Sequence, residues 1–190
     1  MSQPIDIFEE LKKRTDLVPE ASERINRSYD PEDFIEFHAS RLLHLVGYAG
    51  KGRPAQIEGR RRFSFYDFLL RFPVCFEKAA GIFSVQGAFE DYELHNIDSK
   101  MIQHIGGPWD QRYYDILAYL MARKMILLSG DSGWNIALTL AGVAVLKKLE
   151  TPENEKLRKR CRLLKDLFGG YSEKRLQGFI DKHFPYTRIA

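Results

Sequence analysis

The chain has 190 residues, of which 44% are hydrophobic and 29% are charged, and its formal net charge is +3. A chain of this length can form one hydrophobic core, or one core that carries an additional helical lobe. The longest weakly polar run, residues 136–146, contains a threonine and a glycine and falls short of the roughly 20 apolar residues of a membrane-spanning helix. We therefore expect a cytoplasmic chain with no membrane partner.

Two further features agree with a reducing compartment. The two cysteines, Cys75 and Cys161, are far apart and form no CxxC motif. The first thirteen residues become acidic early and contain no apolar run, so we expect no secretory signal.

Charge is distributed unevenly along the chain. Residues 1–33 hold five Lys/Arg against nine Asp/Glu, residues 34–150 hold fourteen against twelve, and residues 151–190 hold ten against five. An acidic beginning and a basic end suggest charged partners, but not the strongly basic composition of a typical nucleic-acid-binding protein.

The predicted organisation begins with an amphipathic arm. Apolar residues at Ile5, Ile7, Phe8 and Leu11 have a rough helical spacing, and we expect residues 1–29 to form an arm and linker. Asp30 and the proline that follows it are typical of a helix start, so a single helical domain is expected over residues 30–190, with its first helix running to about residue 48.

The middle of the chain predicts a loop and then buried helix. Glycines and Pro54 break the first helix, and residues 49–62 are expected to form a flexible basic loop. Ser64 is the expected cap of the next helix, which is too uniformly apolar to face water. Because of Pro73, residues 72–81 should form either a kinked continuation of that helix or a new turn of helix, ending at Gly81. Residues 82–105 show only a weak pattern, and residues 91–105 could form a short strand or irregular structure.

Residues 107–149 carry the clearest structural pattern. Asp110 can cap a helix over residues 111–124, and two β-prone runs, residues 125–129 and 134–138, are joined by a short glycine-containing turn. Thr139 then precedes another helix. The order helix, strand, turn, strand, helix is typical of a winged helix, so the predicted fold is mainly α with a small β-hairpin wing. The winged-helix-like core is expected at about residues 98–150, with additional helices around it.

Two more helices should complete the domain. Pro152 opens a helix that ends before Gly169, and Ser172 starts another that ends at Phe184. They form the predicted C-terminal helical pair, residues 152–185.

Two surfaces are predicted to bind partners. The helix before the wing carries more aromatic and apolar residues than a helix that reads DNA bases, which favours protein contact. The predicted protein-interface residues lie in the arm and at the start of this helix: Ile7, Phe8, Leu11, Trp109, Asp110, Tyr113 and Tyr114. The predicted contacts to nucleic acid or to an acidic protein lie in the basic loop: Lys51, Arg53, Arg60, Arg61 and Arg62. A solvated loop paired with the acidic first third is the competing interpretation.

Enzymatic chemistry is not expected. The GDSGW motif at residues 130–134 resembles the loop around a serine nucleophile, but it sits in a predicted turn between two strands of a helical chain. The five histidines show no metal-ligand spacing, and no carboxylate pair suits acid–base catalysis. We expect no catalytic residues, no metal and no cofactor.

Four segments resemble a known family. Residues 41–73, 99–126, 137–149 and 162–185 are similar to the small middle component of bacterial ABC three-component systems, which include the Lamassu anti-phage defence complexes. The motifs IEGRRRFSFYDFLLRFP and GPWDQRYY, in that order, carry most of this resemblance.

The resemblance implies a non-catalytic accessory subunit. Such a subunit would bridge an SMC- or Rad50-like ATPase and an effector, often a nuclease, and would help to keep the effector inactive; non-specific contact with DNA is a further expectation. A winged-helix transcription regulator of the MarR type is the alternative, because the helix after the hairpin also suits such a domain. A small nuclease is a third interpretation, for which the sequence offers no metal ligands.

Overall fold

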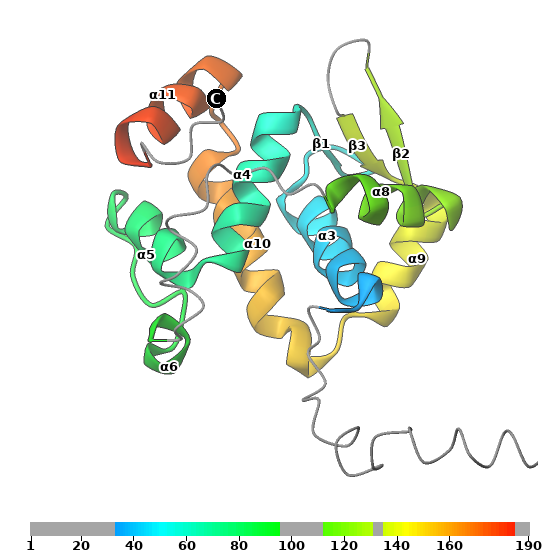
Figure 1. Ribbon diagram of the computed structural model, residues 1–190, viewed down its shortest axis with the longest axis horizontal. Coiled ribbons are helices and arrows are strands. Elements are labelled where there is room, and N and C mark those ends of the chain that lie inside the picture. Colours follow the sequence, from blue (N-terminus) through cyan, green and yellow to red (C-terminus); the bar gives the residue numbers. More distant parts are fainter. Residues whose placement is uncertain (1–32, 96–111, 131–134, 185–190) are drawn as a thin grey trace, which may run out of the picture. The chain divides into compact units, whose positions relative to one another are not determined.

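The computed structural model describes residues 33–95, 112–130 and 135–184. The chain divides into two compact units, Met1–Phe34 and Ile35–Ala190, and nearly all of the first unit lies outside the described residues. The second unit is mainly helical and contains a small antiparallel sheet (Figure 1). Among the described residues, no helix combines the length and the apolar character that crossing a bilayer requires.

The second unit begins with a helix, a short strand and another helix. These elements are α3 (Ile35–Ala49), β1 (Gln56–Ile57) and α4 (Arg60–Arg71). Gly59, at the N-cap of α4, has φ of 89°, a left-handed conformation that favours glycine and that turns the chain from β1 into α4. Two predictions for this region are wrong. β1 lies inside the predicted flexible loop, and α4 begins four residues before Ser64, whose hydroxyl donates to the Arg61 carbonyl within the helix.

Two short helices follow and lead toward the second half of the chain. They are α5 (Pro73–Gly81), which matches the predicted new turn of helix and has proline at its first position, and α6 (Asp91–Leu94), in the region where the sequence pattern was weak. A reciprocal capping box between Glu90 and Glu93 holds α6.

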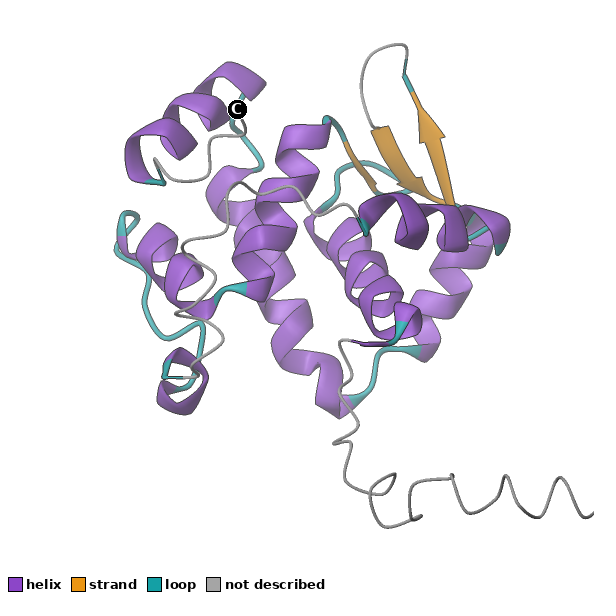
Figure 2. Cartoon of the chain, viewed as in Figure 1, coloured by secondary structure: helices purple, strands orange, loops and turns teal. Residues whose placement is uncertain are grey.

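The sheet is built from β1 and a hairpin. After α8 (Tyr113–Ala122), the strands β2 (Ile126–Ser129) and β3 (Asn135–Leu138) pair antiparallel, with Leu127 opposite Ala137. β1 pairs with the other side of β3, so the strand order is β1-β3-β2 and β2 is an edge strand (Figure 2). The predicted hairpin is confirmed, and the third strand was not predicted.

The last helices follow the predicted order. They are α9 (Leu140–Lys148), the 3-10 turn η3 (Pro152–Asn154), α10 (Glu155–Phe168) and α11 (Glu173–His183). Both predicted caps are present, because Thr139 accepts a hydrogen bond from Gly142 N and Ser172 accepts one from Arg175 N. The predicted caps Asp30 and Asp110 lie outside the described residues.

The core is aromatic on the side of the C-terminal helices. The Phe65 ring of α4 lies 5.5 Å from the Phe168 ring of α10, which in turn lies 5.1 Å from the Phe179 ring of α11. Phe83, just after α5, contacts Phe168 at the same 5.5 Å, so four helical segments share one cluster of edge-to-face rings. This cluster leaves α8 and the sheet on a different part of the unit, where their outer surfaces are open.

Candidate functional site: the α8–β2 surface and the basic loop

The exposed side of α8 is mostly apolar. Tyr113, Ile116, Leu117 and Leu120 form the buried face of this helix at the expected spacing. Away from that face, α8 exposes Tyr114 (56%), Ala118 and Met121 along one side, with the exposed Asp115 and Ala122 beside them. This face has the composition of a protein contact.

The apolar surface continues onto the edge strand β2. Leu127 is 63% exposed and Leu128 is 37% exposed. Their side chains point to opposite faces of β2. We use the name α8–β2 surface for the exposed apolar residues of these two successive elements, Tyr114, Ala118, Met121, Leu127 and Leu128. Isolated exposed apolar residues are ordinary, but a series of them on a helix and the strand that follows it marks an interaction site.

Two exposed cations border this surface where α8 turns into β2. Arg123 caps the end of α8, and its guanidinium lies 4.5 Å from the centre of the Tyr119 ring. Lys124 follows in a left-handed conformation, with φ of 56°. Leu140, at 91% exposure, begins α9 next to the same turn, since Thr139 before it donates to the Lys124 carbonyl. An apolar centre with a charged border is the usual anatomy of a protein interface.

Tyr113 is not part of this surface, and its predicted role as an exposed anchor is wrong. Its side chain is buried, and its hydroxyl donates to Asp67 Oδ2 at 2.7 Å. Burial, followed by the charge of Asp67, raises the pKa of Tyr113 well above its ordinary value. The reason for the difference is helical geometry, because neighbouring residues on a helix point about 100° apart and only Tyr114 faces outward.

Asp67 is the centre of a buried polar network that the sequence did not reveal. The Arg41 guanidinium of α3 donates from Nε to Asp67 Oδ1 at 2.7 Å and from Nη2 to Oδ2 at 3.2 Å. Arg41 also reaches His38 Nδ1 at 3.0 Å. A buried carboxylate requires this kind of pairing, and the network joins α3, α4 and α8 behind the α8–β2 surface. Its complete enclosure suits a structural role, since no part of Asp67 is exposed to a substrate.

The basic loop is divided between solvent and the protein itself. Lys51, Arg53 and Arg60 are exposed, and Arg61 is about half exposed, with its guanidinium 3.7 Å from Glu173. These four cations lie around β1 and the first turn of α4, where a helix N-terminus adds a partial positive charge. Contact of these four cations with an anionic partner stays a prediction.

Arg62 does not share that ability, and its predicted role in partner binding is wrong. Its side chain is only 12% exposed, and its guanidinium donates to the carbonyls of Phe168 at 3.2 Å and Tyr171 at 2.5 Å. These carbonyls belong to the end of α10 and the turn after it. Arg62 thus satisfies helix-end acceptors that have no partner within their own helix.

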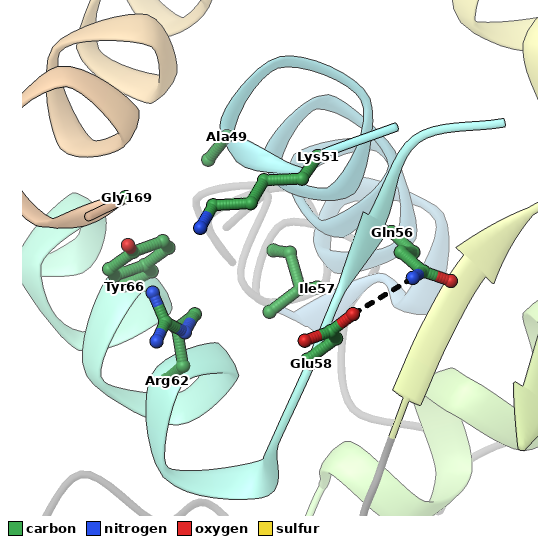
Figure 3. A pocket seen from close by; sticks show the side chains of 8 residues that line it. All are labelled: Ala49, Lys51, Gln56, Ile57, Glu58, Arg62, Tyr66 and Gly169. Atoms are coloured by element: carbon green, nitrogen blue, oxygen red, sulfur yellow. Dashed lines mark hydrogen bonds between the residues drawn. The ribbon is translucent and has the colours of Figure 1, made fainter. Parts of the chain in front are cut away.

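A small pocket lies between β1, α4 and the end of α10 (Figure 3). Lys51, Tyr66 and Arg62 approach it from one side and Glu58 from the other, where Glu58 accepts a hydrogen bond from Gln56. Burial raises the pKa of the Tyr66 hydroxyl, an effect that the nearby Arg62 charge opposes. The mixture of two cations and a carboxylate does not select one class of ligand.

The described residues contain no cluster of three or more His, Cys, Asp or Glu side chains that could hold a metal ion. Cys75 and Cys161 are both buried and unbonded to each other, and burial raises the pKa of the Cys161 thiol. A buried thiol with a raised pKa stays protonated and serves to fill space in the core.

The other predicted interface residues cannot be placed. Ile7, Phe8, Leu11, Trp109 and Asp110 all lie outside the described residues.

Comparison of the chain with protein-family models, with curated proteins and with solved structures finds no match.

Sequence reasoning missed the contribution of β2. Leu127 and Leu128 were assigned to a wing, with no prediction of their surroundings. Their signal is the apolar run at residues 125–128, which has no polar alternation and therefore cannot bury all of its side chains in a two-sided hairpin.

Proposed function

We propose that this protein is a non-catalytic subunit built on a winged-helix-like domain, which binds a protein partner through the α8–β2 surface. The order of the elements is that of a winged helix: helix α3, strand β1, helices α4 and α8, then strands β2 and β3. Helices α5 and α6 are inserted before α8. The central position of β3 in the sheet agrees with this arrangement. In this interpretation, α8 is the helix that would enter the major groove of DNA in a regulator.

The exposed face of α8 is the observation that carries the proposal. A helix that reads bases presents arginine, asparagine, glutamine or other polar side chains to the groove. Here one exposed side presents Tyr114, Ala118 and Met121; Asp115 is the exposed charge within α8, and the exposed Arg112 and Arg123 stand at its two ends. A tyrosine and a methionine bury a large area at low entropic cost in a protein interface, and neither supplies a bidentate contact to a base edge.

The resemblance described above identifies the class of partner that we propose. The subunit would act as the middle component of a Lamassu-type complex, bridging an SMC- or Rad50-like ATPase and an effector nuclease, and would help to keep the effector inactive. The exposed cations at Lys51, Arg53 and Arg60 would supply a second, electrostatic contact, either to DNA or to an acidic partner surface.

Co-elution tests this proposal. The chain should be expressed with the proteins encoded by its neighbouring genes and passed through a size-exclusion column. The proposal predicts one peak that contains this chain, a long coiled-coil ATPase and a third protein. Separate elution of the folded chain from an ATPase of this kind would contradict it.

A winged-helix transcription regulator of the MarR type remains the second candidate, and the exposed cations near the start of α4 favour it. A regulator should bind one duplex sequence tightly by itself, with an affinity that falls steeply as salt increases. Fluorescence anisotropy with labelled duplexes separates the two functions. Weak, sequence-independent binding by the isolated chain supports the subunit, and tight binding to one sequence supports the regulator.

A further inference from the structure

The free edge of β2 has backbone groups available for another strand. Because the strand order is β1-β3-β2, only one side of β2 is paired among the described residues. Figure 1 shows β2 as the outermost arrow, beside α8 and away from β1. An edge of this kind can accept an extended segment through main-chain hydrogen bonds.

The hydrogen bonds of β3 determine which residues face that edge. The Leu138 N–H donates to the Ala55 carbonyl at 3.0 Å, on the β1 side, whereas the Thr139 N–H donates to the Met125 carbonyl at 3.1 Å, on the β2 side. Backbone direction alternates along an antiparallel strand, so Leu127 and Ser129 point toward β3. The N–H and C=O groups of Ile126 and Leu128 therefore point toward the free edge.

Among the described residues, the edge has one feature that limits strand addition, its short length, and β2 lacks charged residues and proline. Natural edge strands are commonly protected by lysine, proline, a bulge or a covering element. The four residues of β2 are Ile126, Leu127, Leu128 and Ser129, which include no charge and no proline. The strand is short, so its edge can serve a specific partner without forming an extended aggregation template.

Two cations at one end of β2 favour a particular charge at the matching end of an added strand. Arg123 and Lys124 are exposed directly before β2 begins. A strand that pairs antiparallel with β2 places its C-terminal end beside these two cations. An acidic residue at that end would be attracted to them, and a basic one would be repelled.

We propose that the β2 edge accepts an extended segment of a partner protein as a fourth, antiparallel strand. The segment has an apolar residue opposite Leu127 and one or more acidic residues at its C-terminal end, beside Arg123 and Lys124. This inference rests on the proposed function, because it specifies how the α8–β2 surface engages part of its partner.

A synthetic peptide tests the edge by itself. The probe is a seven-residue peptide of alternating threonine and valine that ends in two glutamates, and binding to the full chain is measured by isothermal titration calorimetry. Replacing both glutamates with lysines should weaken binding, because like charges then meet at Arg123 and Lys124.

Backbone methylation provides the sharpest control. If valine lies opposite Leu127, the threonine N–H groups point toward Ile126 and Leu128, and the valine N–H groups point away. Methylating the threonine amides should abolish binding, whereas methylating the valine amides should leave it within about twofold.

Two variants of the chain locate the site. Leu127→Glu should weaken binding of the acidic peptide about tenfold or more, since it removes an apolar contact and adds a like charge. Ile82→Glu makes the same kind of change at a residue that is 43% exposed beside α5, and it should have no effect. Circular dichroism confirms that both variants are folded.

The outcomes separate this inference from the proposed function. Tyr114→Glu, on the outer face of α8, should preserve peptide binding while it weakens assembly with the whole partner. No binding of the unmodified peptide to the folded chain, or equal binding of the threonine-methylated peptide, would overturn the inference and leave the proposed function standing. Self-association of the chain that Leu127→Glu abolishes would identify a second copy as the occupant and would also overturn it.

Discussion

Two neighbouring tyrosines have opposite roles in this molecule. Tyr113 is buried and donates to Asp67, whereas Tyr114 is exposed on the outer face of α8. The sequence could predict a helix here and could predict that some of its aromatic residues fill the core. It could not assign each tyrosine, because the buried partner of Tyr113 lies 46 residues away in α4.

Tyr113→Phe should destabilise the protein by about 1–3 kcal/mol, since it removes the shorter of the two hydrogen bonds to Asp67 Oδ2 and leaves that oxygen with the Arg41 donor alone. Urea unfolding followed by circular dichroism measures the change. Tyr92→Phe is the matched control, because Tyr92 is 72% exposed, and it should change stability by less than about 0.5 kcal/mol. Equal stability of the two variants would contradict the network around Asp67.

The burial of Tyr113 should also make the free energy of unfolding depend on pH in the alkaline range. The pKa of Tyr113 is raised in the folded state, so above about pH 10 the unfolded chain loses a proton that the folded chain retains. The folded state then binds more protons, and stability falls as pH rises, by about 1.4 kcal/mol per pH unit for one such tyrosine. The pKa of Tyr48, raised to about 12 by burial and Glu150, contributes in the same direction.

A comparison with Tyr113→Phe isolates the contribution of one residue. The variant lacks this phenol, so its free energy of unfolding should fall less steeply than that of the wild type between pH 10 and 11. The titration of lysines is common to both proteins. Parallel curves would show that the Tyr113 hydroxyl titrates normally in the folded protein.

At the scale of elements, α9 is held close to the turn between α8 and β2. A Cβ atom at Gly142, in the first turn of α9, would lie 2.0 Å from the Met125 carbonyl oxygen. That contact is with backbone, which cannot move aside as a flexible side chain can. Position 142 therefore requires glycine, because the backbone of α9 lies so close to the Met125 carbonyl. The same close packing holds the turn that joins α8 to β2 in place.

Gly142→Ala should destabilise the protein by about 2 kcal/mol or more, because backbone must shift to relieve the overlap. Gly178→Ala offers a control in α11, where a Cβ atom would meet nothing within 4 Å. That change should be neutral or stabilising by up to about 1 kcal/mol, as expected for alanine in a helix interior. Thermal unfolding of both variants checks the pair, and a stabilised Gly142→Ala protein would contradict the packing of α9.

The elements that the sequence predicts well are those with local signals. Thr139 and Ser172 cap their helices as predicted, because a side-chain oxygen followed by an apolar run is a local pattern. The strand β1 has only two residues and lies among glycines and a proline, so its pairing with β3 depends on a contact 79–81 residues away along the chain. The start of α4 was missed because its first three residues are arginines that directly follow a segment rich in glycine, so they were assigned to the loop.

In the molecule as a whole, only part of the two candidate surfaces could be predicted from the sequence. The basic loop was visible in the sequence. Its most buried cation, Arg62, donates hydrogen bonds to carbonyls at and after the end of α10 and is not available to a partner. The apolar character of the helix before the wing was also visible. The continuation of that surface onto the edge of β2 was not, because edge position depends on the strand order of the folded sheet.

In the proposed complex, the partner protein binds mainly through the α8–β2 surface, and the basic loop supplies a second, weaker contact. The most direct test is the dissociation constant of the complex with the ATPase encoded beside this chain, measured for the wild type, Met121→Glu and Arg53→Glu. We expect Met121→Glu to weaken the complex about tenfold or more, since a charge enters an apolar interface, and Arg53→Glu to weaken it by a clearly smaller factor, since the basic loop supplies only the second contact. An unchanged dissociation constant for folded Met121→Glu would contradict the claim.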